Sequence, residues 1–597
     1  MLESPKRVSA GIGTPMRFFL HRRDRGTFYQ MHVATLHPTY DWAFTGHRMS
    51  AYSTREKQIV PAGTARTRRR PERQPTGGTT SVATWIANTT PSGWIMLGAC
   101  VVALMLALQT LQGRSAGYDE GVYWQSLRAM ADGHSLFGSV FSSQPPLFLL
   151  SVYPFYIIFG QSLSAARLAL VFFSLAGVAG TYVAGRALGH RTAGAAACLL
   201  LALDPLYEQA AHTLQAELPS IALQIWAVAC AALEMRATGR RRGWLAAGAG
   251  VLLGCALLIK LFAIAALFPV VLYLSSPFAR RWLDDDGSPR QPPWRLIRED
   301  LRQIAPTLGL LAAGLLGVII LILLPFVGQL GTVYDQAVRF HFAAAQTVNY
   351  PLRENLRLIG MTLLAAPLVY IAMLAVLAIT WRRMWVSVPL IFWALAAFVT
   401  LAQQQPLFGR HVVLLSPALA LISGCGAFAA WQVFRAPSIQ RAGLAITLIL
   451  LAGGVGAGLA INLQRNASAS APSPARILNM AIALQRVSAP NEVVLSDDQY
   501  VAALANRDVP PELVDTSFVR IRSGYLTTAM FEDVIARYRI HVILFASGRF
   551  DRLPGVRAWV AQRYTQVRTF DHHGALFLLE SNINGTEMAP TPSTPSR

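Results

Sequence analysis

The acidic pair Asp119-Glu120 lies a few residues after a long apolar segment that begins near Trp94. Acidic side chains close to a bilayer are costly to bury, so they tend to be retained for a function. A carboxylate in such a place can act as a general base that takes a proton from a hydroxyl or amine nucleophile. On the local sequence alone, an acid pair that caps a short interfacial helix explains the same residues.

Further polar residues stand where other apolar stretches begin. The sequence Gln144-Pro145-Pro146 directly precedes one of them, and its two prolines restrict the backbone as it returns to the membrane interface. Glu217 opens another apolar stretch, at a position where the positive end of a helix favours an acid. Glu217 is therefore either a simple helix cap or a second acid of a site.

Lys260 interrupts the apolar sequence between the runs 252–259 and 261–271. Its ammonium must reach the headgroups or find a partner, so it is either a turn residue that snorkels or a cation that binds a lipid phosphate. Similar reasoning adds basic candidates later in the chain: Arg339, His341, Arg410 and His411. Such cations can stabilise a phosphate as charge develops on it. The residues thus suit a reaction that needs a base and a phosphate clamp.

The composition indicates the environment that must position these residues. The chain has 597 residues, of which 53% are hydrophobic and 14% charged. Soluble domains carry about a quarter charged residues, so the sequence predicts an α-helical polytopic membrane protein. Most of the net charge of +21 lies in the N-terminal region and in short loops, which favours a positive-inside topology over nucleic-acid binding. The five cysteines fall in apolar segments without a CxxC motif, so no disulfide framework or zinc site is indicated.

The placement of the arginines predicts how the chain crosses the membrane. The segment 147–159 is roughly 13 residues long, short of the ~20 that a span needs, so we expect it to lie along the interface. The arginine clusters between the other segments then fall on the cytoplasmic side, and residues 113–163 form the first outer loop. About eleven spans result, at 94–112, 164–187, 192–206, 218–235, 244–260, 261–276, 304–327, 358–380, 385–402, 411–434 and 442–462.

The two ends of the chain differ from this membrane module, residues 93–463. Residues 1–92 are basic and rich in small polar residues, so we expect a disordered cytoplasmic tail, unless translation starts further downstream. Residues 470–582 alternate predicted strands and helices, which is typical of a small soluble α/β domain. Its expected strands are 492–496, 540–545 and 574–579, and its expected helices are 526–537 and 556–563. Residues 583–597 are predicted to be disordered.

Asp497-Asp498 follows the first expected strand of this C-terminal domain. Acids at the end of a strand can belong to a ligand site. We favour the commoner alternative, in which they are surface residues of a turn.

The order of these residues resembles the GT-C glycosyltransferases, most closely the family that joins protein O-mannosyltransferases to the aminoarabinose transferase of lipid A. In that family an Asp-Glu pair opens the first outer loop, and Asp119-Glu120 matches it. A later Pro-Pro-Leu matches Pro145-Pro146-Leu147, and an outer acid and an outer lysine match Glu217 and Lys260. Some members have a basic residue before the double proline, where this chain has Gln144. The resemblance covers residues 94–260 and is looser up to 462.

The resemblance implies that a sugar moves from a polyprenyl-phosphate carrier to an acceptor outside the membrane, by single displacement with inversion. Asp119 would be the general base, with Glu120 and Glu217 as further catalytic acids. The implied substrate-binding residues are Tyr118, Gln144, Pro145, Lys260, Arg339, His341, Arg410 and His411. The sugar would be a hexose or pentose, and the acceptor a protein, a glycolipid or a polysaccharide. A divalent cation, Mg or Mn, is an open alternative because carboxylates suit a hard ion.

Two other kinds of protein compete with this interpretation. A transporter or lipid flippase would also have many spans, but the sequence shows no internal repeat, and its polar residues gather at one face. A non-catalytic anchor for the C-terminal domain does not explain the acids and Lys260 on the outer side. We therefore expect a transferase of the cell envelope in the plasma membrane, with the N-terminus cytoplasmic and the C-terminal domain extracytoplasmic.

Overall fold

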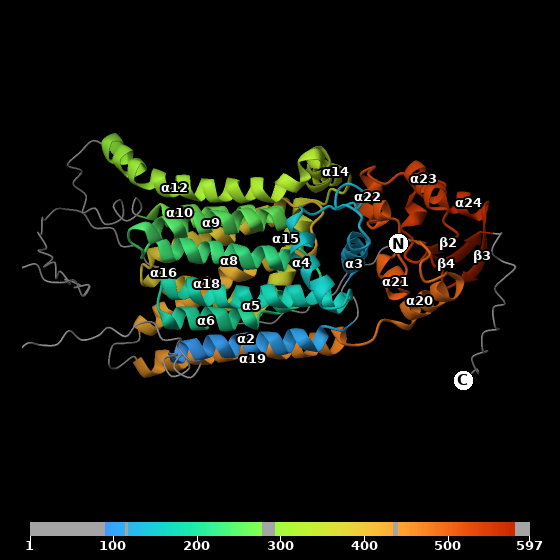
Figure 1. Cartoon of the computed structure of the whole chain (residues 1–597). Helices are drawn as coiled ribbons and strands as arrows, with labels where there is room; N and C mark the ends of the chain where they lie inside the picture. The colour runs from blue at the N-terminus through green and yellow to red at the C-terminus, as the bar shows by residue number, and fades with distance from the viewer. Residues whose placement is uncertain (1–89, 114–116, 277–292, 434–439, 580–597) are drawn as a thin grey trace, which may run out of the picture. The chain divides into compact units, whose positions relative to one another are not determined.

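The computed structural model describes residues 90–113, 117–276, 293–433 and 440–579. The predicted tail 583–597, and all but the last three residues of the predicted tail 1–92, lie outside these ranges. The described residues form a bundle of long apolar helices followed by an α/β region at residues 475–579, which we call the C-terminal region (Figure 1).

The long helices of the bundle expose large apolar side chains such as Met105, Phe172, Leu316 and Ile449, as expected for surfaces that face lipid. The long helices are α2 (Pro91–Thr110), α5 (Leu163–Leu188), α8 (Glu217–Glu234), α9 (Arg240–Ile259), α12 (Pro293–Leu323), α17 (Val388–Gln403), α18 (Ser416–Val433) and α19 (Gln440–Ala469). Shorter elements of the bundle are α4 (Leu147–Ile158), α6 (Arg191–Ala202), α7 (Pro205–Ala211), η1 (Leu261–Ala266), α10 (Leu267–Leu274), η2 (Leu324–Gln329), α13 (Leu330–Tyr334), η3 (Asp335–Arg339), α14 (Phe340–Thr347), α15 (Leu352–Leu364), α16 (Pro367–Trp381), η4 (Trp385–Ser387) and η5 (Gly409–Leu415).

The predicted number of eleven spans is not confirmed. Within the described residues, eight helices are long and apolar enough to cross a membrane, or nine when α15 and α16, which meet at an angle of 89°, count as one span. The two remaining predicted spans correspond to α6 and to residues 261–274, which are apolar helices of fewer than 18 residues. The apolar pattern located these segments correctly but could not show that they end early.

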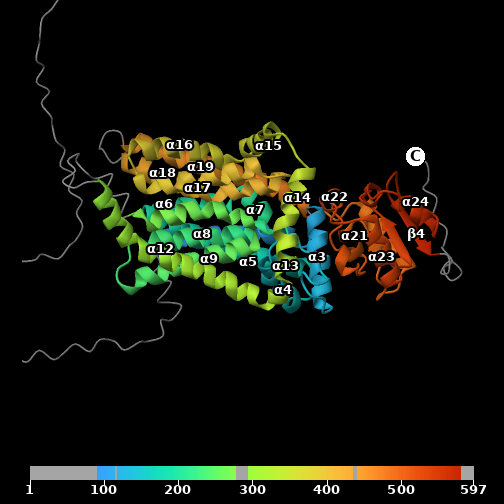
Figure 2. The same cartoon turned by 90° about the horizontal axis from the view of Figure 1, so that it is seen from above.

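The helix α3 (Tyr118–Ala131) lies across one end of the bundle, and the C-terminal region lies on its far side in both views (Figures 1 and 2). We call this end of the bundle the α3 end. The segment 147–159, which we expected to lie along the interface, forms the helix α4, one of the shorter apolar helices, which begins at the α3 end. Elements that begin or end here supply the polar residues that the sequence singled out.

The C-terminal region is built on a four-stranded sheet in the order β1-β2-β4-β3. Strand β1 pairs with β2 in parallel, while β4 pairs antiparallel with both β2 and β3. The strands are β1 (Leu495–Ser496), β2 (Val542–Phe545), β3 (Tyr564–Thr569) and β4 (Ala575–Leu579), and the helices are α20 (Ala475–Val487), α21 (Gln499–Leu504), η6 (Pro511–Leu513), α22 (Phe518–Arg522), α23 (Thr528–Tyr538), η7 (Phe550–Arg552) and α24 (Val556–Ala561). The three expected strands are present, but β3 was missed because it is a polar edge strand with few buried residues.

Helix α3 packs closely against α21 of the C-terminal region. A Cβ atom at Gly121 would lie only 2.3 Å from the backbone nitrogen of Tyr500, so only glycine allows this approach. Trp124, one turn further along α3, packs against the Tyr500 ring with the ring centroids 6.2 Å apart. The closeness of this packing fixes where α3 sits on the C-terminal region.

Polar contacts along α3 complete this interface. The hydroxyl of Tyr118 accepts a hydrogen bond from the Thr516 backbone N–H at 2.7 Å and lies 3.0 Å from the Thr516 hydroxyl. Arg128 forms an ion pair with Asp508 at 2.6 Å at the other end of the helix. Helix α3 therefore carries the acidic pair of the sequence between the membrane bundle and the C-terminal region.

Candidate active site

A cavity of about 580 Å³ opens at the α3 end, among α3, the start of α8, the turn after α9, α14, η5 and the C-terminal region. Nine of the residues predicted from the sequence line it: Tyr118, Asp119, Gln144, Pro145, Glu217, Lys260, His341, Arg410 and His411. We call it the catalytic cavity. Its walls also include the aromatic side chains Phe262, Phe340, Phe342 and Phe408. The cavity thus combines charged groups with apolar aromatic surface.

Asp119 lies in the first turn of α3 and forms an ion pair with Arg410. The positive end of the helix dipole favours a carboxylate at this position. Arg410 belongs to η5, and its guanidinium also lies over the Phe408 ring, 4.6 Å from the centroid. The ion pair brings together residues almost 300 positions apart in the chain.

The surroundings of Asp119 raise the pKa of its carboxyl above the ordinary value. Burial is the largest cause, because it disfavours the charged form. The positive charge of Arg410 acts in the opposite direction, and the negative charge of Asp515 adds to the effect of burial. A raised pKa makes Asp119 a stronger base than an exposed aspartate, which suits a group that must accept a proton.

Glu217 and Lys260 form a second ion pair in the same cavity. The Lys260 Nζ atom lies 2.7 Å from Glu217 Oε1, and His411 Nε2 lies 3.3 Å from the same oxygen. Glu217 is the first residue of α8 and lines the cavity, but the N-cap position is Ala216 and no side chain makes a capping hydrogen bond there. Lys260 has an extended backbone between α9 and η1, and this break between helices explains a lysine within an apolar run.

The segment before α4 forms another wall of the catalytic cavity. His341 Nε2 donates a hydrogen bond to the Ser143 carbonyl oxygen at 2.8 Å, which ties this segment to α14. Gln144 is buried, and its carbonyl oxygen accepts a hydrogen bond from the Ser142 hydroxyl at 2.9 Å. Pro145 then leads into α4. The side chains that this segment adds to the wall, Ser143, Gln144 and Pro145, carry no charge.

Glu120 does not line the catalytic cavity, so its expected catalytic role is corrected to a positioning one. Its carboxylate is fully buried and accepts two hydrogen bonds from the Arg167 guanidinium, at 2.9 and 2.8 Å. It also accepts a hydrogen bond from the Leu214 backbone N–H at 2.8 Å. Arg167 in turn donates to the Gly113 carbonyl oxygen at 2.9 Å. This network joins the start of α3 to α5 and to the end of α2, and so holds the adjacent Asp119 in place.

Replacing Glu120 with glutamine is expected to destabilise the protein by about 3–5 kcal/mol, because the Arg167 guanidinium would stay buried without its counter-charge. Thermal unfolding in detergent measures this change. The matched control is Asp533→Asn, since Asp533 pairs with Arg537 and both side chains are more than half exposed to solvent. Such a surface pair contributes about 0–1 kcal/mol. An unfolding midpoint for Glu120→Gln equal to that of the control would contradict the structural role.

Arg339 also lies outside the catalytic cavity, so its predicted substrate-binding role is corrected. Its side chain is 73% exposed and lies 3.2 Å from Asp335, one helical turn earlier. The preceding and following residues, Val338 and Phe340, do line the cavity. Neighbouring side chains on a helix point in different directions, so Arg339 faces away from the cavity although both of its neighbours line it.

The C-terminal region supplies residues of the catalytic cavity that the sequence did not reveal: Asp515, Ser517, Phe518, Val519 and Arg549. Arg549 stacks on Tyr118, with its guanidinium carbon 3.7 Å from the ring centroid. The Asp515 carboxylate accepts a hydrogen bond from the Ser517 backbone N–H at 2.8 Å. These residues stand in no recognisable motif, and they lie almost 400 positions or more after Asp119 in the chain.

Asp497 holds the loop that carries Arg549. It is fully buried, which corrects the expectation that Asp497 is a surface residue of a turn. Its carboxylate accepts hydrogen bonds from the backbone N–H groups of Ala546 at 2.6 Å and Arg549 at 2.7 Å. The acid pair at the strand end was therefore the one signal in the sequence that pointed towards this part of the site.

The carboxylates of the catalytic cavity do not fit a metal ion. Asp119 is paired with Arg410, and Glu217 is paired with Lys260. Within the part of the chain that the structure describes, no group of three or more His, Cys, Asp or Glu side chains is arranged to hold a metal. The charges of this cavity are balanced among its own side chains.

The chain resembles known proteins in two kinds of comparison, one with a family model and one with solved structures. The family model for dolichyl-phosphate-mannose-protein mannosyltransferase matches residues 143–287. Among solved structures, ArnT from Cupriavidus metallidurans bound to undecaprenyl phosphate matches with a TM-score of 0.56 at 17% identity, over 82% of this chain and 98% of that chain. Its apo state matches with a TM-score of 0.55 at 16% identity, over the same shares. The oligosaccharyltransferase of Archaeoglobus fulgidus in the apo form matches with a TM-score of 0.50 at 12% identity, over 80% of this chain and 73% of that chain.

No curated protein sequence matches the chain. The structural matches nevertheless cover four fifths of it. They show that the chain has the fold of these proteins, and the family model matches a segment of the same chain. The chain is therefore a membrane protein with the GT-C glycosyltransferase fold, related over residues 143–287 to the dolichyl-phosphate-mannose-protein mannosyltransferases, as the resemblance in its sequence implied.

Proposed function

We propose that the protein transfers a sugar from a polyprenyl-phosphate donor to an acceptor at the α3 end of the bundle. The observation that carries this proposal is the meeting of Asp119, Lys260 and Arg410 around one cavity of about 580 Å³. A base and two cations beside apolar aromatic walls are what a lipid-phosphate sugar donor needs. The ArnT structure with undecaprenyl phosphate supports a carrier of this class.

Each group of the cavity has a role in this reaction. Asp119 removes the proton from the acceptor as the acceptor forms a bond to the anomeric carbon of the sugar. The bond from that carbon to the phosphate oxygen breaks, and its electron pair remains on the polyprenyl phosphate. Arg410 and Lys260 stabilise the charge that develops there. Arg410 pairs with Asp119 in the structure. When the donor binds, its phosphate attracts Arg410 away from Asp119, and the carboxylate is then free to act as a base.

We propose a single displacement with inversion, in which Glu217 does not act as a nucleophile. A covalent intermediate would need a second free carboxylate as a nucleophile. Glu217 is engaged by Lys260 at 2.7 Å and lies 3.3 Å from His411, so it is not free to attack. In our proposal Glu217 instead orients Lys260 towards the phosphate.

The cavity faces the extracytoplasmic side in this proposal, in the plasma membrane. Helix α9 begins with three arginines, Arg240–Arg242, and ends next to Lys260. A helix of 20 residues is about 30 Å long, so the arginines lie at the opposite end of the bundle from the cavity. Basic residues favour the cytoplasmic side, which places the α3 end and the C-terminal region outside.

Turnover of a panel of donors by the purified protein tests the proposal. The full chain is reconstituted in proteoliposomes with polyprenyl-phosphate hexoses and pentoses, together with peptide, glycolipid and polysaccharide acceptors. The expected result is release of polyprenyl phosphate together with sugar attached to one acceptor class. Movement of an intact donor across the bilayer, or no consumption of any donor, contradicts a transferase.

The pH dependence of transfer should reflect the raised pKa of Asp119. The carboxylate must be ionised to accept a proton, so kcat/KM falls as the pH drops through that pKa. Replacing Asp515 with asparagine removes a negative charge that raises the pKa of Asp119. The acid limb of the pH profile should therefore move to lower pH in this variant.

The matched control for this experiment is Asp533→Asn, since Asp533 is an exposed acid on α23 and does not line the catalytic cavity. Its pH profile should coincide with that of the wild type. An acid limb that stays in place in Asp515→Asn, or moves to higher pH, contradicts the assignment of that limb to Asp119.

A further inference from the structure

The first turn of α3 carries Asp119, and the residues on either side of Asp119 tie this turn to two different parts of the protein. The helix begins after Gly117, which has no side chain to bond the free N–H groups of the turn. Glu120 joins the turn to Arg167 inside the bundle. Tyr118 joins it to the C-terminal region. The proposed base therefore lies between two contacts that hold it from opposite neighbours in the chain.

The hydroxyl group of Tyr118 is bonded to Thr516. It accepts a hydrogen bond from the Thr516 backbone N–H at 2.7 Å, and the two hydroxyl oxygens lie 3.0 Å apart. Thr516 is fully buried, and the Gln499 side chain of α21 donates a hydrogen bond to its hydroxyl at 3.2 Å. A residue in the interior of the C-terminal region thus fixes the position of the Tyr118 hydroxyl.

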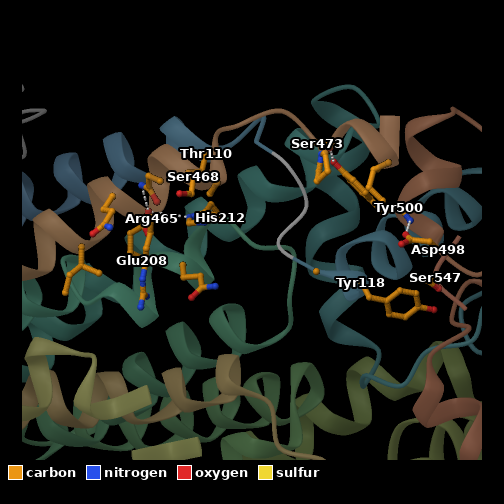
Figure 3. A pocket seen from close by; sticks show the side chains of 18 of the residues that line it. Thr110, Tyr118, Glu208, His212, Arg465, Ser468, Ser473, Asp498, Tyr500 and Ser547 are labelled. Atoms are coloured by element: carbon orange, nitrogen blue, oxygen red, sulfur yellow. Dashed lines mark hydrogen bonds and ion pairs between the residues drawn. The ribbon is translucent and has the colours of Figure 1, made fainter. Parts of the chain in front are cut away.

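The ring of Tyr118 is covered by Arg549, whose guanidinium carbon lies 3.7 Å from the ring centroid. A cation over an aromatic face is attracted by the ring. The loop that carries Arg549 is itself fixed, because several of its backbone N–H groups donate to the buried Asp497 carboxylate. In Figure 3, which views a neighbouring cavity that Tyr118 and Arg549 also line, the Tyr118 ring is directed from α3 towards this loop at Ser547.

Tyr118 and Arg549 also form part of the wall of the catalytic cavity, yet the contacts of both side chains run to the protein. The Tyr118 hydroxyl meets Thr516, and Arg549 Nη1 donates to the Asp497 carbonyl oxygen at 3.3 Å while its guanidinium covers the ring. Side chains that are engaged in this way fix the geometry of their neighbours. A direct contact of Arg549 with the donor phosphate is the alternative, and it predicts a different kinetic result.

We propose that Tyr118 and Arg549 are positioning residues of the transfer reaction, through which the C-terminal region holds the carboxylate of Asp119 in the catalytic cavity. Asp119 remains the group that accepts the proton of the acceptor. Positioning matters to the rate because a displacement of about 1 Å at a reacting group can cost about 10²-fold. This inference rests on the proposed transferase function and adds a role in it for the C-terminal region.

Tyr118→Phe and Arg549→Met test the two contacts separately. Phenylalanine keeps the ring but loses the contacts with Thr516, and methionine keeps a long side chain but loses the cation. Each variant should lower kcat about ten-fold or more, while KM for the donor and the number of polyprenyl-phosphate binding sites per molecule stay at the wild-type values. A merely structural role would lower the number of binding sites in proportion to the rate, so the rate per binding site separates the two roles.

The matched control for these variants is Arg563→Met. Arg563 lies over the Trp559 ring, 4.4 Å from its centroid, in the same C-terminal region, and neither residue lines the catalytic cavity. The substitution removes a contact of the same kind at a distance from Asp119. Its kcat should equal that of the wild type.

Hydrogen–deuterium exchange tests the same contacts without turnover. The full-length protein in nanodiscs is compared with the three variants, and exchange is followed in the peptide that covers α3, residues 118–131. Its amide protons should exchange several-fold faster in Tyr118→Phe and in Arg549→Met, because the first turn opens more often when a contact is lost. Exchange in Arg563→Met should match the wild type.

The two measurements separate the failure of this inference from the failure of the transferase proposal. Absence of donor consumption by the wild type refutes the transferase, whereas exchange still reports whether the C-terminal region holds the first turn of α3. A wild-type kcat in both Tyr118→Phe and Arg549→Met overturns the inference, and so does unchanged exchange in α3. A higher donor KM in Arg549→Met also overturns it, because Arg549 would then bind the donor itself.

Discussion

Replacing Asp119 with asparagine should reduce sugar transfer by about 10²–10⁴-fold, the range expected for loss of a general base. Asparagine keeps the shape of the side chain but cannot accept the proton of the acceptor. The variant also removes the ion pair that holds Arg410, so that guanidinium becomes free to bind phosphate. We therefore expect the affinity for polyprenyl phosphate to be retained or increased while turnover is lost. Transfer of a radiolabelled sugar and binding of polyprenyl phosphate measure the two effects separately.

The matched control for this variant is Asp132→Asn. Asp132 caps the other end of the same helix α3 and does not line the catalytic cavity. Its transfer rate should equal that of the wild type. A rate for Asp119→Asn close to that of this control would show that another group accepts the proton, while a parallel loss of phosphate binding would show that Asp119 acts by holding Arg410.

Replacing Lys260 with methionine should have two large effects. The cavity loses a cation that we assign to the donor phosphate, so kcat/KM for the donor should fall by about 10²-fold or more. The variant also leaves Glu217, which is 5% exposed, without its closest counter-charge. Removing one partner of such a buried pair costs about 3–5 kcal/mol of stability. Thermal unfolding in detergent and donor kinetics would detect these effects.

A second substitution separates the two roles of Lys260. In the double variant Lys260→Met with Glu217→Gln, the uncompensated carboxylate is gone, so the unfolding midpoint should recover towards that of the wild type. Donor turnover should stay low because no cation has been restored. Recovery of turnover along with stability would show that Lys260 only neutralises Glu217, and would remove it from the phosphate site.

The charged residues of the catalytic cavity could be found in the sequence because a bilayer makes each of them conspicuous. Lys260 is the only lysine between residues 90 and 579, and it stands inside an apolar run. Glu217 and Arg410 each open an apolar segment. Since a charge at membrane depth is costly, its presence alone marks a candidate. Their roles in transfer stay predictions, but the structure does bring them to one cavity.

The choice between neighbouring residues could not be predicted in this way. Asp119 and Glu120 are equally acidic and adjacent, yet on a helix successive side chains point about 100° apart. One faces the cavity and the other meets Arg167 in the interior. The same rotation excludes Arg339 while admitting His341. Only the packing of each helix decides which side of it faces the cavity.

The sequence by itself determined that this is a multi-span membrane protein with a C-terminal α/β region, and which charged residues belong to its polar end. Its patterns have periods of a few residues, and the cost of placing charge in lipid is a property of each residue alone. The tertiary structure decided how long each helix is, that Glu120 meets Arg167 away from the cavity, and that Asp515 and Arg549 of the C-terminal region line the same cavity as Asp119. Those outcomes depend on contacts between segments hundreds of residues apart, such as Gly121 against Tyr500, and no local pattern records them.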